Sequence, residues 1–192
     1  MSLFSIIIVA MVVVAAVYGI MVYNSLVTVK HNVSKAWANI DVLLKQRHDE
    51  IPKLVEVCKQ YRQFEQETLT RVIEARSKVF SASQSQNMGE LGKAETQLRG
   101  SLANLFAVAE AYPELKTNEQ FLNLQSRISA LENAIADRRE FYNESVNVNN
   151  VRIEQFPDAI IARMGNFPPR QLLEFSTEEK SDVDVKKLFA TT

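Results

Sequence analysis

The sequence predicts an all-α protein with one N-terminal transmembrane helix, an antiparallel up-down-up-down four-helix bundle with long helices, and an irregular C-terminal tail. Residues 3–23 are almost entirely apolar, and about 20 such residues suffice for a helix to cross a bilayer. The five glycines and five prolines leave three long stretches beyond this segment nearly free of both, which favours helices. Apolar side chains in these stretches recur at helical spacing, and no segment alternates as a strand would.

The first segment, residues 1–23, is interpreted as a retained membrane anchor. A cleaved signal peptide is the alternative, but no basic residue precedes the apolar run, and the run exceeds the roughly 7–15 residues of a signal peptide's apolar region. Lys30 and Lys35 follow the run, and the first acidic residue is Asp41. The positive-inside rule therefore predicts a single-pass protein with its N-terminus outside and residues 24–192 in the cytoplasm.

The second segment, residues 24–156, is predicted to form the cytoplasmic bundle. Its four helices are expected at about 24–47, 50–80, 90–111 and 118–156. Each carries an apolar stripe; that of the first helix consists of Leu26, Val33, Trp37, Ile40 and Leu44. Helices with one apolar stripe each bury it by packing together, with heptad-like contacts as in a coiled coil.

The stretch "QRHDEIPKLV", residues 46–55, is interpreted as the turn between the first two helices. Arg47 would lie at the end of one helix, Asp49 would cap the next, and Pro52 would lie in its first turn. A metal or catalytic cluster is the alternative for such a group of polar residues. Consecutive residues point in different directions around a helix start, so the turn is preferred.

Two further boundaries are marked by turn and capping residues. Residues 81–92 are polar and contain glycine, so they are expected to connect the second and third helices. Thr117 and Gln120 have the spacing of a capping box at the start of the fourth helix. The third segment, residues 157–192, is the tail, in which Asp158 can cap a short helix that Gly165 ends.

The composition and motifs predict no enzyme, no cofactor, no metal and no small-molecule substrate. The net charge of −1 gives no reason to expect nucleic acid as a partner. No phosphate-binding glycine loop and no Glu-x-x-His motif of a di-metal bundle occurs in the sequence. The single cysteine, Cys58, lies on an apolar stripe and is expected to be a core residue.

Three groups of residues are candidates for special roles. Glu65 and Arg139 could form a buried polar layer that fixes the register of the helices, or they could be solvated. Ala15 and Gly19 are four residues apart, a spacing that lets membrane helices approach closely and self-associate. The third group combines apolar and basic side chains of the tail, which suit either an anionic membrane surface or the open end of the bundle: Ile160, Ile161, Arg163, Met164, Phe167 and Arg170.

The order of several motifs resembles that of the LemA family over residues 3–167. These motifs are "YNSLV", "AWANIDVLLKQRHDEIPKLV", "ARSKV", "AYPELKTNEQFLNLQSRISALENAIADRREFYN" and "IEQFP". The resemblance implies one N-terminal membrane helix in the bacterial inner membrane, a cytoplasmic helical bundle, and no established enzymatic activity or cofactor. It also implies relatives in magnetosome-forming bacteria, where such proteins are associated with building or organising membranes.

The family pattern falls on Trp37, Arg47, Asp49, Ile51, Pro52, Leu54, Glu65, Ala75, Arg76, Tyr112, Pro113, Leu115, Glu132, Arg139, Tyr142, Asn143, Phe156 and Pro157. The chain departs from it at Phe64, where histidine is frequent, and at Asn149, where tyrosine is frequent. It also has Asn166 between Gly165 and Phe167, where the family often has a Gly-Phe pair.

Two functions are compatible with these features. One is a non-enzymatic scaffold, tethered to the bilayer, that organises or shapes the cytoplasmic membrane and assembles with copies of itself. The other is an accessory subunit that recognises another membrane protein, such as a protease or a component of an envelope-stress pathway.

Overall fold

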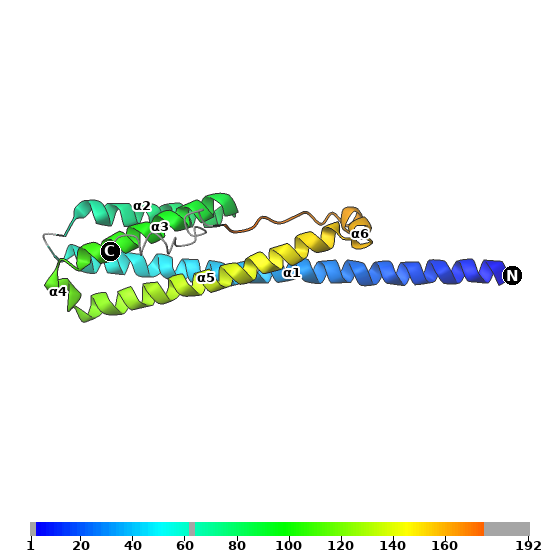
Figure 1. Cartoon of the computed structure of the whole chain (residues 1–192), viewed down its shortest axis with the longest axis horizontal. Helices are drawn as coiled ribbons and strands as arrows, with labels where there is room; N and C mark the ends of the chain where they lie inside the picture. Colours follow the sequence, from blue (N-terminus) through cyan, green and yellow to red (C-terminus); the bar gives the residue numbers. More distant parts are fainter. Residues whose placement is uncertain (1–2, 62–63, 175–192) are drawn as a thin grey trace, which may run out of the picture. The chain divides into compact units, whose positions relative to one another are not determined.

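The computed structural model describes residues 3–61 and 64–174, and every regular element in these residues is a helix (Figure 1). The elements are α1 (Leu3–Lys59), α2 (Gln66–Gln84), α3 (Met88–Ala109), α4 (Pro113–Lys116), α5 (Glu119–Glu154) and α6 (Asp158–Met164). The all-α class and the long apolar N-terminal helix are confirmed. The up-down-up-down arrangement of a four-helix bundle stays a prediction.

The chain divides into two compact units. The anchor unit comprises Met1–Val42 and Ala134–Leu172, and the hairpin unit comprises Leu43–Asn133 and Leu173–Thr192. The boundary between them falls inside α1 and inside α5, so each of these long helices contributes one segment to each unit. The predicted segments 1–23, 24–156 and 157–192 stay predictions.

The predicted turn at residues 46–55 is wrong, because α1 continues through it to Lys59. Residues 50–59 therefore belong to α1, and α2 begins only at Gln66. Asp49 is an exposed residue inside the helix and not a helix cap. Arg47 does not lie at a helix end but is buried in an ion pair with Glu95 of α3.

Pro52 lies inside α1, where a proline ordinarily breaks a helix because it has no N–H for the carbonyl four residues earlier. Here that carbonyl belongs to His48, and the guanidinium of Arg76 donates a hydrogen bond to it from Nε at 2.8 Å. A side chain of α2 thus replaces the missing backbone donor. The helix continues past its proline because the freed carbonyl is satisfied from outside the helix.

Helices α2 and α3 pack side by side as an antiparallel hairpin within the hairpin unit (Figure 1). Their connection is shorter than the predicted 81–92, because it contains only Ser85, Gln86 and Asn87. Gln86 has a left-handed backbone with a φ of 51°, which turns the chain sharply. Asn87 then caps α3, since its Oδ1 accepts a hydrogen bond from the N–H of Glu90 at 3.1 Å.

The start of α5 is capped by Asn118, whose Oδ1 accepts a hydrogen bond from the N–H of Phe121 at 2.9 Å. The predicted capping box of Thr117 and Gln120 is therefore wrong. Thr117 has a helical backbone because it ends α4, and its hydroxyl donates to the carbonyl of Pro113. The helix itself agrees with the prediction to within two residues at each end.

The short helix of the tail is confirmed as α6, and Gly165 is its C-terminal cap as predicted. Asp158 does not cap it; the residue before the helix is Pro157, and no side chain caps this end. The carboxylate of Asp158 instead accepts a hydrogen bond from Nε of Arg152 at 2.6 Å. This ion pair ties the first turn of α6 to the last turn of α5.

Candidate membrane-interface site

The N-terminal part of α1 exposes nearly all of its apolar side chains. Phe4, Val14 and Met21 are 72%, 68% and 65% exposed, and most residues between Leu3 and Tyr23 are exposed like them. An apolar surface of this extent is not stable in water and is typical of a surface covered by lipid. Among the residues that the structure describes, this is the one helix long and apolar enough to cross a membrane.

Helix α6 packs against α1 within the anchor unit, immediately after the apolar segment. Val22 and Leu26 of α1 and Ala162 of α6 are buried together, and Ile153, Ile161 and Phe167 pack against them. In the tail, Ile161 and Ala162 belong to α6, and Phe167 follows its end. Burial of this cluster anchors the tail to α1.

Polar contacts around this cluster fix the tail in place. Nη2 of Arg152 donates to the hydroxyl of Ser25 at 3.0 Å, so the Arg152–Asp158 pair also contacts α1. After α6, the side-chain amide of Asn150 forms two hydrogen bonds of 2.9 Å with the backbone N–H and carbonyl of Arg170. The Tyr142 hydroxyl donates to the carbonyl of Gln171 at 3.0 Å. Hydrogen bonds to α5 and packing on α1 thus hold the tail in place.

An open groove of about 360 Å³ lies between α1 and α6. Ala16, Gly19 and Tyr23 line its α1 side, while Ile161 and Met164 line its α6 side. A Cβ added at Gly19 would lie 3.8 Å from Cδ1 of Ile161, which is ordinary van der Waals contact. The glycine therefore faces α6 of the same chain, and Ala15 is exposed. Self-association of the membrane helix through these two residues stays a prediction.

Aromatic and basic side chains lie at the end of the groove nearer Lys30. The Phe167 ring meets the Tyr23 ring edge-on, with centroids 5.7 Å apart. Nζ of Lys30 lies 5.9 Å from the centroid of the Phe167 ring, close enough for a cation–π contact. Aromatic rings and cations in this position, at the end of an apolar span, are typical of a membrane–water interface.

The outer side of the tail remains open. Phe156, Ile160 and Met164 are 84%, 52% and 81% exposed. The side chains of Arg163 and Arg170 are on the exposed surface as well. Of the predicted tail residues, Ile161 and Phe167 therefore pack on α1, Ile160 is exposed, and Met164 lines the groove while most of its side chain stays exposed. A lipid contact of these outward residues stays a prediction.

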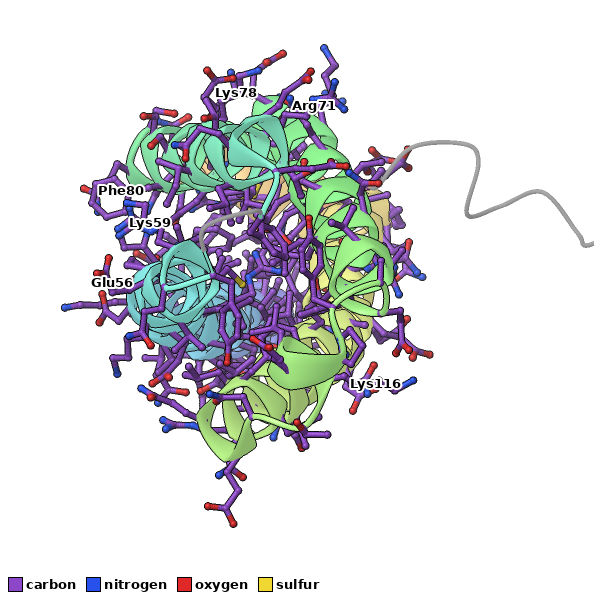
Figure 2. The ribbon with its side chains drawn as sticks, turned by 90° about the vertical axis from the view of Figure 1, so that its left-hand side faces the viewer. Glu56, Lys59, Arg71, Lys78, Phe80 and Lys116 are labelled. Carbon is purple, nitrogen blue, oxygen red and sulfur yellow. The ribbon has the colours of Figure 1, made fainter. Side chains whose placement is uncertain are left out.

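The polar residues of the hairpin unit have a different role. Arg71 and Lys78 point away from α2 into solvent (Figure 2), whereas Arg47 and Glu95 are buried together. Glu50 is also buried, and its carboxylate accepts hydrogen bonds from Arg127 at 2.7 Å and from Lys53 at 3.1 Å. These contacts link α1 with α3 and α5 inside the unit.

The sequence prediction chose other residues for this buried polar layer. Glu65 is exposed at the start of α2 and accepts a hydrogen bond from the Thr68 hydroxyl at 3.1 Å, which does not fit a buried layer. Arg139 is half-buried and lies in the anchor unit, and its pairing with Glu65 stays a prediction. One signal was available: Glu95 lies four residues after Leu91, on the apolar stripe of α3.

The side chains most able to do chemistry are placed in packed surroundings. Cys58 is buried, and burial raises the pKa of its thiol to about 12, so the thiolate nucleophile does not form at neutral pH. The His48 ring stacks on Phe80 with centroids 4.6 Å apart, and burial and the neighbouring Arg76 lower its pKa. Within residues 3–61 and 64–174, no group of three or more His, Cys, Asp or Glu side chains could hold a metal ion.

Comparisons with known proteins show which proteins the chain is similar to. Residues 36–186 match the family model of the LemA family. Protein LemA of Metamycoplasma hominis is 26% identical over 166 residues, which cover 86% of this chain and 74% of that protein. Magnetosome protein MamQ 2 of Paramagnetospirillum magneticum is 21% identical, with 88% and 71% of the two chains covered. Magnetosome protein MamQ of Magnetospirillum gryphiswaldense is 22% identical, with 77% and 63% covered.

Proposed function

The chain belongs to the LemA family, and from this membership and the exposed apolar span we propose that it is a membrane-tethered, non-enzymatic scaffold that organises or shapes the membrane holding α1. The observation that carries the proposal is the continuity of α1. One unbroken helix includes the apolar span, the α1 part of the anchor unit and the first segment of the hairpin unit. The likeness to proteins named for magnetosomes, which are membrane organelles, supports a role at membranes.

Helix α1 extends far beyond the apolar span, and its length and stiffness matter for the tether. The part between Tyr23 and Lys59 extends roughly 50 Å at 1.5 Å per residue. A continuous helix resists sharp bending, because a sharp bend would break backbone hydrogen bonds. The replacement donor from Arg76 at the proline supports this stiffness. Helix α1 is thus the continuous connection between the apolar span and the residues that follow it in water.

We place these surfaces on the cytoplasmic side, because Lys30, His31 and Lys35 are exposed on α1 directly after the span. The buried Cys58 cannot report on topology, so a Cys58→Ser background is needed. In that background, a membrane-impermeant maleimide should label Ser2→Cys in intact cells, but Ser77→Cys on the exposed side of α2 only after lysis. Labelling in the reverse pattern contradicts this orientation.

An exposed apolar stripe on α5 supports self-assembly. Phe141, Val148 and Val151 are exposed and spaced by seven and three residues, which is the spacing of one seam of a coiled coil. A seam this narrow is covered by a similar seam on another helix, and a second copy of the chain presents one. The occupant that we propose is therefore a second copy.

The test is purification of the full chain in mild detergent, followed by mass measurement and reconstitution into vesicles of phosphatidylcholine and phosphatidylglycerol. We expect one homo-oligomeric species and a change in vesicle shape, visible by electron cryomicroscopy, that grows with the protein-to-lipid ratio. Val148→Ser combined with Val151→Ser should reduce both effects, whereas the control Val42→Ser on an exposed position of α1 should not. A monomer that leaves the vesicles unchanged contradicts the scaffold, and a stoichiometric foreign protein favours an accessory subunit.

A further inference from the structure

We propose that the groove between α1 and α6 binds one acyl chain of an anionic phospholipid, so that α6 forms a second membrane contact beside the span. This inference rests on the membrane anchoring of the proposed function and names the ligand of its interface site. It concerns the groove lined by Ala16, Gly19, Tyr23, Ile161 and Met164. Each argument below uses contacts within the anchor unit.

The position of the groove along α1 indicates that lipid, and not water, surrounds it. Its α1 wall runs from Ala16 to Tyr23, the last two turns of the apolar span. In a bilayer these turns lie among acyl chains near the interface, where an apolar groove is not stably filled by water. At about 360 Å³ the groove is at the small end of ligand sites, and it is open along its side. It therefore accepts a segment of one chain.

The other wall of the groove makes it a built site and not a flat side of a membrane helix. Ile161 is held against Val22 and Leu26 by the cluster that includes Ala162. Arg152 and Asn150 hold the chain on either side of α6 through the hydrogen bonds to Asp158 and Arg170. The groove thus exists before a lipid enters, so little conformational entropy is lost on binding.

Charge near the groove selects an anionic headgroup. Lys30 follows Tyr23 by seven residues, which is about 10 Å along the helix, enough to reach from the edge of the hydrocarbon core into the headgroup region of about 5–8 Å. Arg163 lies between the groove residues Ile161 and Met164 in sequence and is exposed. The acidic residue of α6, Asp158, is already paired with Arg152. The cations near the groove are therefore available to a phosphate.

The outward residues of the tail extend the same contact. Ile160 and Met164 are exposed on α6, and Phe156 is exposed just before it. Apolar side chains flanked by arginine insert into the boundary between headgroups and chains. A helix of seven residues buries too little surface to bind a membrane alone, but α1 holds this one at the interface. A second membrane helix is the other possible occupant, yet Ile161 already covers Gly19.

The test uses the full chain in vesicles of phosphatidylcholine and phosphatidylglycerol in a roughly 3:1 ratio. The phosphatidylglycerol gives the vesicles a negatively charged surface. A trace of phosphatidylglycerol with a diazirine on one acyl chain is activated by light, and adducts are located by mass spectrometry. We expect adducts on Ile161 and Met164 in addition to the exposed span. Ala16→Phe, which fills the groove, should reduce the α6 adducts several-fold. The matched control Ala10→Phe, an exposed alanine of the span outside the groove lining, should not.

The possible results distinguish failure of the groove proposal from failure of the membrane tether. Adducts on the span but none on α6, or equal α6 adducts in both variants, would overturn the groove proposal and leave the membrane tether intact. Adducts on neither would overturn the tether itself. A second arm replaces the probe by diazirine-labelled phosphatidylcholine at equal mole fraction. Weaker α6 labelling by that probe supports an anionic headgroup, and equal labelling overturns this part of the proposal.

Discussion

The two units of the molecule differ in how deeply the charged residues between their helices are buried. In the hairpin unit, Arg47 and Glu95 are buried as a pair, and the buried carboxylate of Glu50 pairs with Arg127, whose side chain is largely exposed. In the anchor unit, Lys30, Arg163 and Arg170 have exposed side chains, and the Arg152–Asp158 pair is partly covered. Buried pairs act on folding because each partner left alone is strongly penalised. Exposed cations contribute little to folding and remain available for a ligand. We therefore expect the buried pair of the hairpin unit to fix how its helices align, and the exposed cations of the anchor unit to contact lipid.

The largest expected effect is the loss of the Arg47–Glu95 pair. Arg47→Met leaves the Glu95 carboxylate buried without its partner, and such a change costs roughly 3–5 kcal/mol of unfolding free energy. The same substitution at exposed Arg163 of the anchor unit should cost less than about 0.5 kcal/mol. Denaturant titration of the full chain in detergent, followed by circular dichroism, measures both.

A double variant distinguishes burial of charge from loss of packing. Combining Arg47→Met with Glu95→Leu replaces both charges by apolar groups, which is often neutral for a buried pair. The double variant should therefore be more stable than Arg47→Met alone. Equal losses in Arg47→Met and Arg163→Met would erase the difference between the units.

A smaller effect is expected at the proline of α1. Arg76→Met removes the donor to the carbonyl of His48 and should cost about 1–2 kcal/mol, the lower part of the range for an unsatisfied acceptor, because the contact is only partly buried. In a Pro52→Ala background the alanine N–H can donate to the same carbonyl within the helix. Arg76→Met should then cost clearly less. A thermodynamic cycle of the four proteins measures this coupling, and strictly additive losses would show that Arg76 does not act on the proline site.

This proline also shows why the sequence predicted some elements and missed others. The bounds of α3, α5 and α6 depend on local signals, namely apolar periodicity and the residues that begin and end helices. The end of α1 depends on Arg76, which is 28 residues from His48. A proline in the turn after an aspartate such as Asp49 normally indicates a helix start, and the contact from Arg76 is not visible in the local sequence. Local patterns therefore predicted a turn where the fold has a continuous helix.

The sequence predicted which residues make up the candidate site, but not how they contact one another. Its apolar and basic tail residues were visible in the sequence, and so was the small residue Gly19 in the span. That Ile161 lies against Gly19 follows from a contact between residues 142 positions apart, which no local pattern encodes. Small residues in a membrane helix predicted a contact with another membrane helix. The structure places a helix of the same chain beside Gly19, and self-association through Ala15 and Gly19 stays a prediction.

The smallest expected effect concerns Glu132, the half-buried acid near the Arg47–Glu95 pair. Burial raises its pKa above the ordinary value of 4.5, although Arg47 and Arg99 oppose this shift and Glu95 adds to it. Because the folded state holds this proton more tightly than the unfolded state, the free energy of unfolding decreases as pH rises from about 4.5 through the raised pKa of Glu132.

Glu132→Gln keeps a neutral side chain of the same shape at every pH. The variant should therefore gain stability relative to the natural chain between pH 4 and pH 7, by about 1 kcal/mol or less after allowance for partial exposure. Denaturant titrations of both proteins at the two pH values measure the difference, in which the titration of all other groups largely cancels. A variant that instead loses stability relative to the natural chain as pH rises would mean that the Glu132 carboxylate is favoured in the fold. In that case Glu132 would be a third charged partner in the buried layer of the hairpin unit.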